Sequence, residues 1–435
     1  MPSKVLEMTS EEIEEEKRIK RQIENIENTG RWWELWESEE AKEYFARIGC
    51  SDTIEVAICE LKKVFTAECY KAMVNKKREA LNTEQFKSSA YGTARYLELR
   101  DYYHPLISPL LFHVPTEFEK KLLKQPNPVD FSIVTPVTLG FAIKELGGFE
   151  KLSENAKGDL RRARDFQDRY YEIVVEAFFK MFYKDFTVTF EEDLLNKGSK
   201  RPDMRIDDVM YVEIKNLNMS DYEKRIHEII EKEITNTIRK RTKDFEGSAR
   251  YNISFDQVGF DLEEIIRAAE TTKKLIESVE VKTGKAIVKK EGIVSIELNF
   301  TPDNGRELSD LSGTIIGLGQ SEINDLYRIW RILTTPKVLE KNPGDLPMVL
   351  VINPSTSMSA IKDEKYREIV GAELFESAIS KDGRVKLIKE LWIDITTSGH
   401  EEVKRKFCDP TSFLSRSFIK IRNPFYVSKN ELQGY

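Results

Sequence analysis

Hydrophobic and polar positions follow two different spacings along the chain, and the spacing separates helical segments from strands. Residues 9–28 place four isoleucines roughly along one face of a predicted helix. Thr9 and Glu12 match a capping box at its start. Helical spacing recurs over residues 53–75 and 83–103, and prolines at 126 and 128 disfavour helix beyond them. Residues 1–125 are therefore predicted to form a helical N-terminal domain.

Residues 126–435 alternate helical and strand patterns, and are predicted to form one α/β domain. Helical spacing covers residues 153–182, as one long helix or two joined helices, and also residues 221–245, 262–279, 321–333 and 363–379. Strand patterns cover residues 186–190, 348–352 and 385–395, and residues 286–290 with 292–300 form a predicted hairpin. Most of residues 217–319 is an insertion if strand 348–352 pairs directly with the strands before it. Such an insertion can serve specificity or structure alone.

Composition narrows the class of protein. The net charge of -7 over 435 residues argues against a generally basic nucleic-acid coater, although a local basic cleft remains compatible with it. The four cysteines have no C-x-x-C spacing, which favours a reducing compartment. Neither an apolar leader nor an uninterrupted apolar run of membrane-spanning length is present. We expect a soluble, cytoplasmic protein with no membrane partner.

Three tryptophans lie close together at positions 32, 33 and 36. They could stack on the bases of a single strand, but tryptophans this close more often pack against each other in a core. We therefore expect a packing cluster.

The strongest chemical signal is the segment from Arg201 to Lys215, which alternates apolar and charged residues around Asp207-Asp208. Period-2 alternation predicts two short strands joined by a turn, with Glu213 and Lys215 on one face and Asp203 brought alongside them. Two carboxylates beside an ammonium suit metal-assisted hydrolysis of a phosphodiester. The same three side chains can also form an exposed ion-pair ladder, worth only about a few tenths of a kcal/mol.

The sequence Pro202-Asp203, nine further residues, then Glu213-Ile214-Lys215 resembles the PD-(D/E)XK nuclease superfamily. The resemblance includes a preceding helix that carries a glutamate, and it covers about residues 170–216. The later helix and the strand at residues 348–352 fit more loosely. The resemblance implies a restriction-endonuclease-like core, in which helices flank a central mixed β-sheet.

The resemblance also implies roles for individual residues. Asp203 and Glu213 would bind Mg²⁺, for which Mn²⁺ can substitute, and the backbone carbonyl of Ile214 would add a ligand. Lys215 would orient the attacking water and offset charge on the phosphate. The helix glutamate is either Glu172 or Glu176, which lie one turn apart; Glu172 fits better because apolar residues follow it at core spacing.

The expected function is a Mg²⁺-dependent endonuclease that hydrolyses phosphodiester bonds in DNA, of the restriction or mobile-element defence type. Such enzymes often act as homodimers, and the resemblance carries that expectation. One alternative is a non-cleaving module that binds nucleic acid or assembles with partners; another is a nuclease for RNA or for branched or single-stranded DNA. Arg161, Arg162 and Arg164 precede the glutamate-bearing helix and either grip phosphates or decorate a solvated helix.

Overall fold

The computed structural model describes residues 8–82, 103–123, 131–190, 201–217, 237, 247–255, 262–278, 286–291, 294–302, 311–316, 322–342, 346–354, 360–396 and 410–428. The helices predicted over residues 83–103 and 221–245 lie almost wholly outside these ranges, as does the predicted boundary near residue 125. None of the helices in the described ranges is long and apolar enough to cross a membrane.

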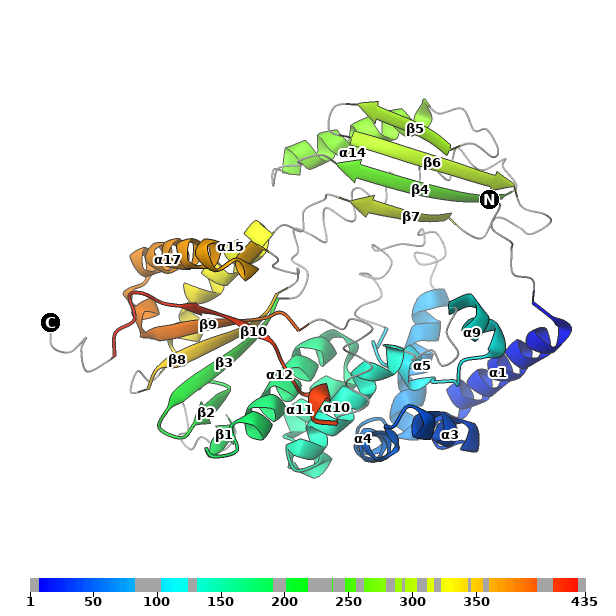
Figure 1. Ribbon diagram of the computed structural model, residues 1–435, viewed down its shortest axis with the longest axis horizontal. Coiled ribbons are helices and arrows are strands. Elements are labelled where there is room, and N and C mark those ends of the chain that lie inside the picture. Colours follow the sequence, from blue (N-terminus) through cyan, green and yellow to red (C-terminus); the bar gives the residue numbers. More distant parts are fainter. Residues whose placement is uncertain are drawn as a thin grey trace.

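The first half of the described chain is helical, as predicted (Figure 1). The predicted capping box is present, because Thr9 and Glu12 each accept a hydrogen bond from the other's backbone N–H. The helix predicted over residues 53–75 is broken into two at Phe65, and Thr66 caps the second by accepting from the Cys69 N–H at 3.3 Å. The helices are α1 (Ser10–Thr29), α2 (Trp33–Trp36), α3 (Glu39–Arg47), α4 (Ser51–Val64), α5 (Ala67–Asn82), α8 (Ile107–Leu110), α9 (Glu117–Leu123), α10 (Val134–Glu145), α11 (Glu154–Arg161) and α12 (Ala163–Phe182).

The tryptophan cluster belongs to the core, which confirms the packing interpretation. Trp32 and Trp36 are fully buried, and their indole N–H groups donate to the backbone carbonyls of Phe65 and Leu110 at 2.7 and 2.9 Å. Buried indoles with satisfied N–H groups serve packing and are not available for stacking on bases.

His104 is also part of this core. Its ring lies between Phe65 and Phe166, its Nε2 donates to the Leu160 carbonyl at 2.8 Å, and its Nδ1 accepts from the Leu106 N–H at 3.2 Å. These two hydrogen bonds require the neutral ring with its proton on Nε2. Burial lowers the pKa of His104 to about 4, although the bond to the Leu160 carbonyl opposes the shift.

Helix α12 connects the helical part to the β-sheet by burying two stripes of side chains. Phe166, Val174 and Ala177 join the helical core, which begins near Ile26 and therefore extends well past residue 125. Val175 and its neighbours at helical spacing pack on the sheet instead. The residues between the two stripes, including Glu172, lie at the helix surface and are partly exposed.

The main sheet has six strands in the order β1-β2-β3-β8-β9-β10 and is mixed, as expected (Figure 1). Strands β3, β8 and β9 are parallel neighbours, and the other pairings are antiparallel. Helix α12 covers one face, while α15 (Glu322–Leu333) and α17 (Glu364–Lys381) cover the other. The strands are β1 (Val188–Phe190), β2 (Met204–Ile206), β3 (Met210–Asn216), β8 (Met348–Asn353), β9 (Ile388–Asp394) and β10 (Phe418–Arg422).

The predicted hairpin forms β2 and β3. Met204 pairs with Val212 and Ile206 with Met210, and Asp207 has the positive φ of 37° that the tight turn requires. The face of this hairpin that carries Glu213 does not face solvent, because helices cover both faces of the sheet. Glu213 is fully buried.

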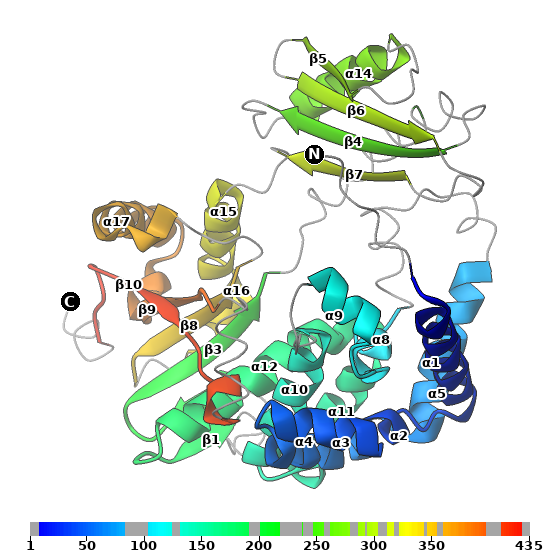
Figure 2. The same cartoon turned by 45° about the vertical axis from the view of Figure 1, so that its right-hand side comes forward.

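A second sheet of four strands lies in the chain between β3 and β8, within the predicted insertion (Figure 2). Its order is β5-β6-β4-β7, and α14 (Leu262–Glu277) packs on β5 and β6. The predicted hairpin is confirmed as β5 (Ala286–Glu291) and β6 (Val294–Pro302), whereas β4 (Gly247–Phe255) and β7 (Leu311–Ile316) were not predicted. Because β3 and β8 pair in parallel, the chain leaves the main sheet after β3 and returns to the adjacent position.

Candidate active site

The β2–β3 pairing brings the two predicted carboxylates together. Met204 lies opposite Val212, so continuing the same register places Asp203 opposite Glu213. The Asp203 side chain is fixed to the neighbouring strand, because its Oδ2 accepts the Ile214 backbone N–H at 2.6 Å. The local sequence therefore fixes both the position of Asp203 and the direction of its carboxylate.

Burial separates this pair from an exposed ion-pair ladder. Asp203 is 9% exposed and Glu213 is 0% exposed. The pKa of Glu213 is raised to about 6, because burial and the charge of Asp203 raise it more than Lys215 and Lys341 lower it. Two buried carboxylates this close repel each other and lose hydration, so they persist only with cations beside them.

Lys215 supplies one of those cations. Its Nζ lies 2.5 Å from Glu213 Oε1 and 2.8 Å from the Ile214 carbonyl oxygen, and its side chain is 31% exposed. Two of its three N–H groups thus have acceptors among the described residues. The third can reach a group that approaches from solvent.

Lys341 supplies the second cation, and it was not predicted. Its Nζ lies 3.1 Å from Asp203 Oδ1, and 2.8 and 3.0 Å from the two oxygens of Glu213. The residue follows α16 (Pro336–Leu339) and precedes β8, more than 120 positions from either carboxylate in the chain. No local pattern marks it; only the pairing of β8 with β3 brings it near.

Of the two candidate helix glutamates, Glu172 interacts with the site. Burial raises its pKa to about 7, the Arg169 guanidinium at 2.9 Å opposes the shift, and the charge of Asp203 adds to it. Lys215 also acts on Glu172, whereas the charge of Glu176 acts on Arg169. Glu172 is thus electrostatically linked to Asp203 and Lys215, and it remains the preferred candidate for the helix glutamate.

Asn216 ties the site strand to the helix and to the next strand. Its Nδ2 donates to Asp168 Oδ1 at 2.9 Å, and its Oδ1 accepts from Asn353 Nδ2 at 2.8 Å. This chain of hydrogen bonds links α12, β3 and β8 at the end of β3 where Lys215 lies. The end of β3 is thus held in place by hydrogen bonds to α12 on one side and to β8 on the other.

The donor set suits a small divalent cation in part. Asp203, Glu213 and the Ile214 carbonyl offer hard oxygen ligands, and Mg²⁺ usually completes its shell with water. Within the described ranges, no three His, Cys, Asp or Glu side chains form a group that could hold a metal, so Glu172 is not a third direct ligand in this arrangement. The residues that would hold the ion are therefore the two carboxylates, with water and the carbonyl.

A basic cavity of about 510 Å³ lies at the start of α12, whose first residue, Ala163, is nine residues before Glu172. Lys76, Arg161, Arg162 and Arg164 contribute to its lining, against one acidic residue, Asp165. Arg161 also donates to two backbone carbonyls at the end of α4, and Arg162 pairs with acidic neighbours, so part of this charge serves the fold. The remaining charge and the N-terminal end of α12 make the cavity favourable for anions.

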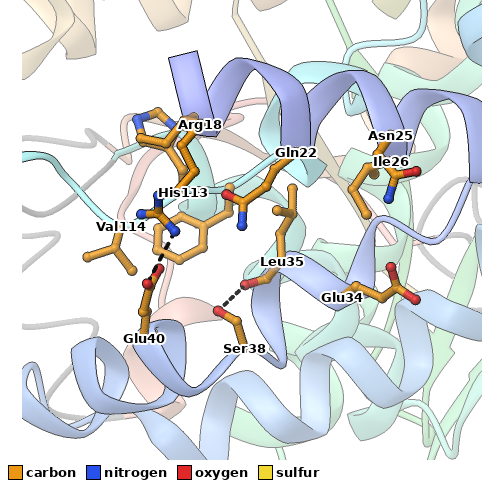
Figure 3. A pocket seen from close by; sticks show the side chains of 12 residues that line it. Arg18, Gln22, Asn25, Ile26, Glu34, Leu35, Ser38, Glu40, His113 and Val114 are labelled. Atoms are coloured by element: carbon orange, nitrogen blue, oxygen red, sulfur yellow. Dashed lines mark hydrogen bonds and ion pairs between the residues drawn. The ribbon is translucent and has the colours of Figure 1, made fainter. Parts of the chain in front are cut away.

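A second cavity, of about 200 Å³, lies between α1 and the α2–α3 segment (Figure 3). Arg18 and Glu40 form an ion pair at 3.3 Å beside it, and Ser38 donates to the Leu35 carbonyl at 3.0 Å. Its lining mixes apolar and paired polar groups and includes none of the residues around Asp203.

In comparisons with protein-family models, with curated proteins and with solved structures, nothing matches this chain.

Proposed function

We propose that this protein is a nuclease that depends on a divalent metal ion and hydrolyses phosphodiester bonds in DNA. The observation that carries the proposal is the buried pair Asp203 and Glu213, held on adjacent strands with Lys215 at its open side. Burying such a pair opposes folding, and apolar residues of similar size would often serve stability as well or better. A role in catalysis, and not in stability, would explain why the two carboxylates are buried together.

We expect the side chains of this site to have different roles in the reaction. A divalent ion bound by the two carboxylates would lower the pKa of water and stabilise negative charge on the phosphate. Lys215 reaches solvent and keeps one N–H free of acceptors among the described residues, so it can orient the attacking water or contact the phosphate. Glu172, with its pKa raised to about 7, can exchange a proton near neutral pH and is the candidate for positioning that water.

The basic cavity supports a polyanionic substrate. Arg164 and Glu172 are eight residues apart on one helix, which corresponds to about 12 Å along its axis. One nucleic-acid strand is long enough to contact both. The proposal for DNA, for a restriction or defence role and for a homodimer otherwise rests on the resemblance of the hairpin motif.

Incubation of the protein with plasmid DNA and Mg²⁺ tests the chemistry. We expect nicked or linear plasmid with the wild type, and none after addition of EDTA or with Lys215→Ala. Lys180→Ala is the matched control, because Lys180 is an exposed lysine of α12 outside the site, and it should cleave like the wild type. Cleavage that survives both EDTA and Lys215→Ala would refute the proposal. Plasmid binding without cleavage would instead favour the non-cleaving module.

A further inference from the structure

Lys341 occupies the centre of the carboxylate pair. Its ammonium contacts three carboxylate oxygens, one from Asp203 and two from Glu213, at 2.8 to 3.1 Å. The Lys341 side chain is 21% exposed to solvent, whereas the Glu213 side chain is fully buried. The ammonium therefore lies between the oxygens that a divalent ion would use.

The segment around Lys341 is fixed at the backbone. The Lys341 N–H donates to the Val338 carbonyl at 3.1 Å, and Asn342 Nδ2 donates to the Leu387 carbonyl at 3.3 Å. These two hydrogen bonds hold the backbone around Lys341 in place. The ammonium can therefore leave the carboxylates by a movement of the side chain alone.

An ammonium that lies between the two carboxylates competes with a divalent ion for their oxygens. Mg²⁺ requires oxygen ligands at about 2.0–2.1 Å, and an ammonium bound to the same oxygens would be a like charge within a few ångströms of it. Lys215 differs in this respect, because its Nζ contacts only one carboxylate oxygen of the pair and a backbone carbonyl.

We infer that Lys341 is a resident cation of the Asp203–Glu213 site, which holds the two carboxylates together and must withdraw before a divalent metal ion binds there. The inference rests on the proposed function and deepens it. Lys341 is in this sense a positioning residue: it stabilises the metal-free site and weakens the affinity of that site for metal.

Calorimetric titration of the full chain with Mn²⁺, in the absence of DNA, tests the inference. Lys341→Met keeps the length of the side chain and removes its charge, so the variant should bind Mn²⁺ at least about tenfold more tightly than the wild type. Lys337→Met, at an exposed lysine of α16 shortly before Lys341, should bind like the wild type. Asp203→Asn should abolish this uptake in both backgrounds.

The outcomes separate this inference from the proposed function. Asp203-dependent uptake of equal or weaker affinity in Lys341→Met would overturn the role of Lys341 and leave the metal site intact. Absence of Asp203-dependent uptake in both the wild type and Lys341→Met would overturn the metal site itself, and with it the inference.

A folding measurement covers the case in which Lys341→Met unfolds without metal. Circular dichroism with and without Mn²⁺ should then show that the ion restores the fold, because it replaces the missing positive charge. A variant that stays unfolded with Mn²⁺ would overturn the inference. Lys341→Arg keeps the charge and should bind Mn²⁺ no more tightly than the wild type; tighter binding would count against competition by charge.

Discussion

Asp203 has one observed contact and one proposed role, and substitution can separate the two. Its Oδ2 accepts the buried N–H of Ile214 at 2.6 Å, which is a structural contact, and its charge is part of the candidate metal site. Asp203→Asn keeps an oxygen that can accept the same N–H and removes the charge. Asp203→Ala removes both.

The difference in unfolding free energy between these variants isolates the hydrogen bond. Lys341 loses its Asp203 partner but keeps Glu213 in both variants, so that effect largely cancels. In the alanine variant the Ile214 N–H is left buried without its acceptor, which costs about 1–3 kcal/mol. Asp203→Ala should therefore be less stable than Asp203→Asn by about that amount.

Urea denaturation followed by circular dichroism, without divalent ions, measures this difference, and Mn²⁺ calorimetry on the same samples measures the chemical role. Both variants should lose Mn²⁺ uptake. Equal stability of the two variants, within about 0.5 kcal/mol, would refute the structural role of the hydrogen bond. Normal Mn²⁺ affinity in Asp203→Asn would refute the role of Asp203 as a ligand.

Acid should destabilise the helical part through His104, because burial lowers its folded-state pKa to about 4 from 6.5. The stabilisation is present above 6.5 and is lost as the pH falls towards 4, by up to about 3 kcal/mol. Urea titrations should show this loss in the wild type and in His113→Gln but far less in His104→Gln; equal losses in all three would contradict it. Glu172 should act in the opposite direction, since its pKa is raised to about 7 from 4.5: its stabilisation is present below 4.5 and is lost as the pH rises through 7. Glu172→Gln should accordingly gain about 1–2 kcal/mol over the wild type between about pH 5 and about pH 8, a value reduced for the partial exposure of the side chain, and a gap that does not change with pH would rule this out. Arg164→Ala should weaken DNA binding and lower the slope of log Kd against log salt by about 1, whereas Lys180→Ala should not; an unchanged slope would place Arg164 outside the DNA path.

Strong local patterns made much of the fold predictable. The capping box of Thr9 and Glu12, the alternation around Asp207 and the apolar run before Asn353 each lie where the sequence placed them. Strand β10 was not predicted, although Ile419 and Ile421 alternate with polar residues, because the alternation extends over only five residues. These elements depend on the spacing of apolar and polar residues over a few positions, and that spacing can be read from the sequence.

The parts of the site that escaped prediction depend on contacts distant in the chain. The burial of Glu213 follows from α15 and α17 covering its face of the sheet, and nothing near Glu213 in the sequence shows that cover. Lys341 joins the site because β8 returns beside β3 after the second sheet. The sequence could present Asp203, Glu213 and Lys215 together only because one hairpin contains all three.

The position of Mn²⁺ in crystals soaked with that ion tests the metal site most directly, by anomalous diffraction. We expect one strong peak bonded to carboxylate oxygens of both Asp203 and Glu213, with the Lys341 ammonium displaced from between them. A peak at another place in the molecule, or no peak while Lys341 still bridges the two carboxylates, would contradict a metal-dependent nuclease centre at this hairpin.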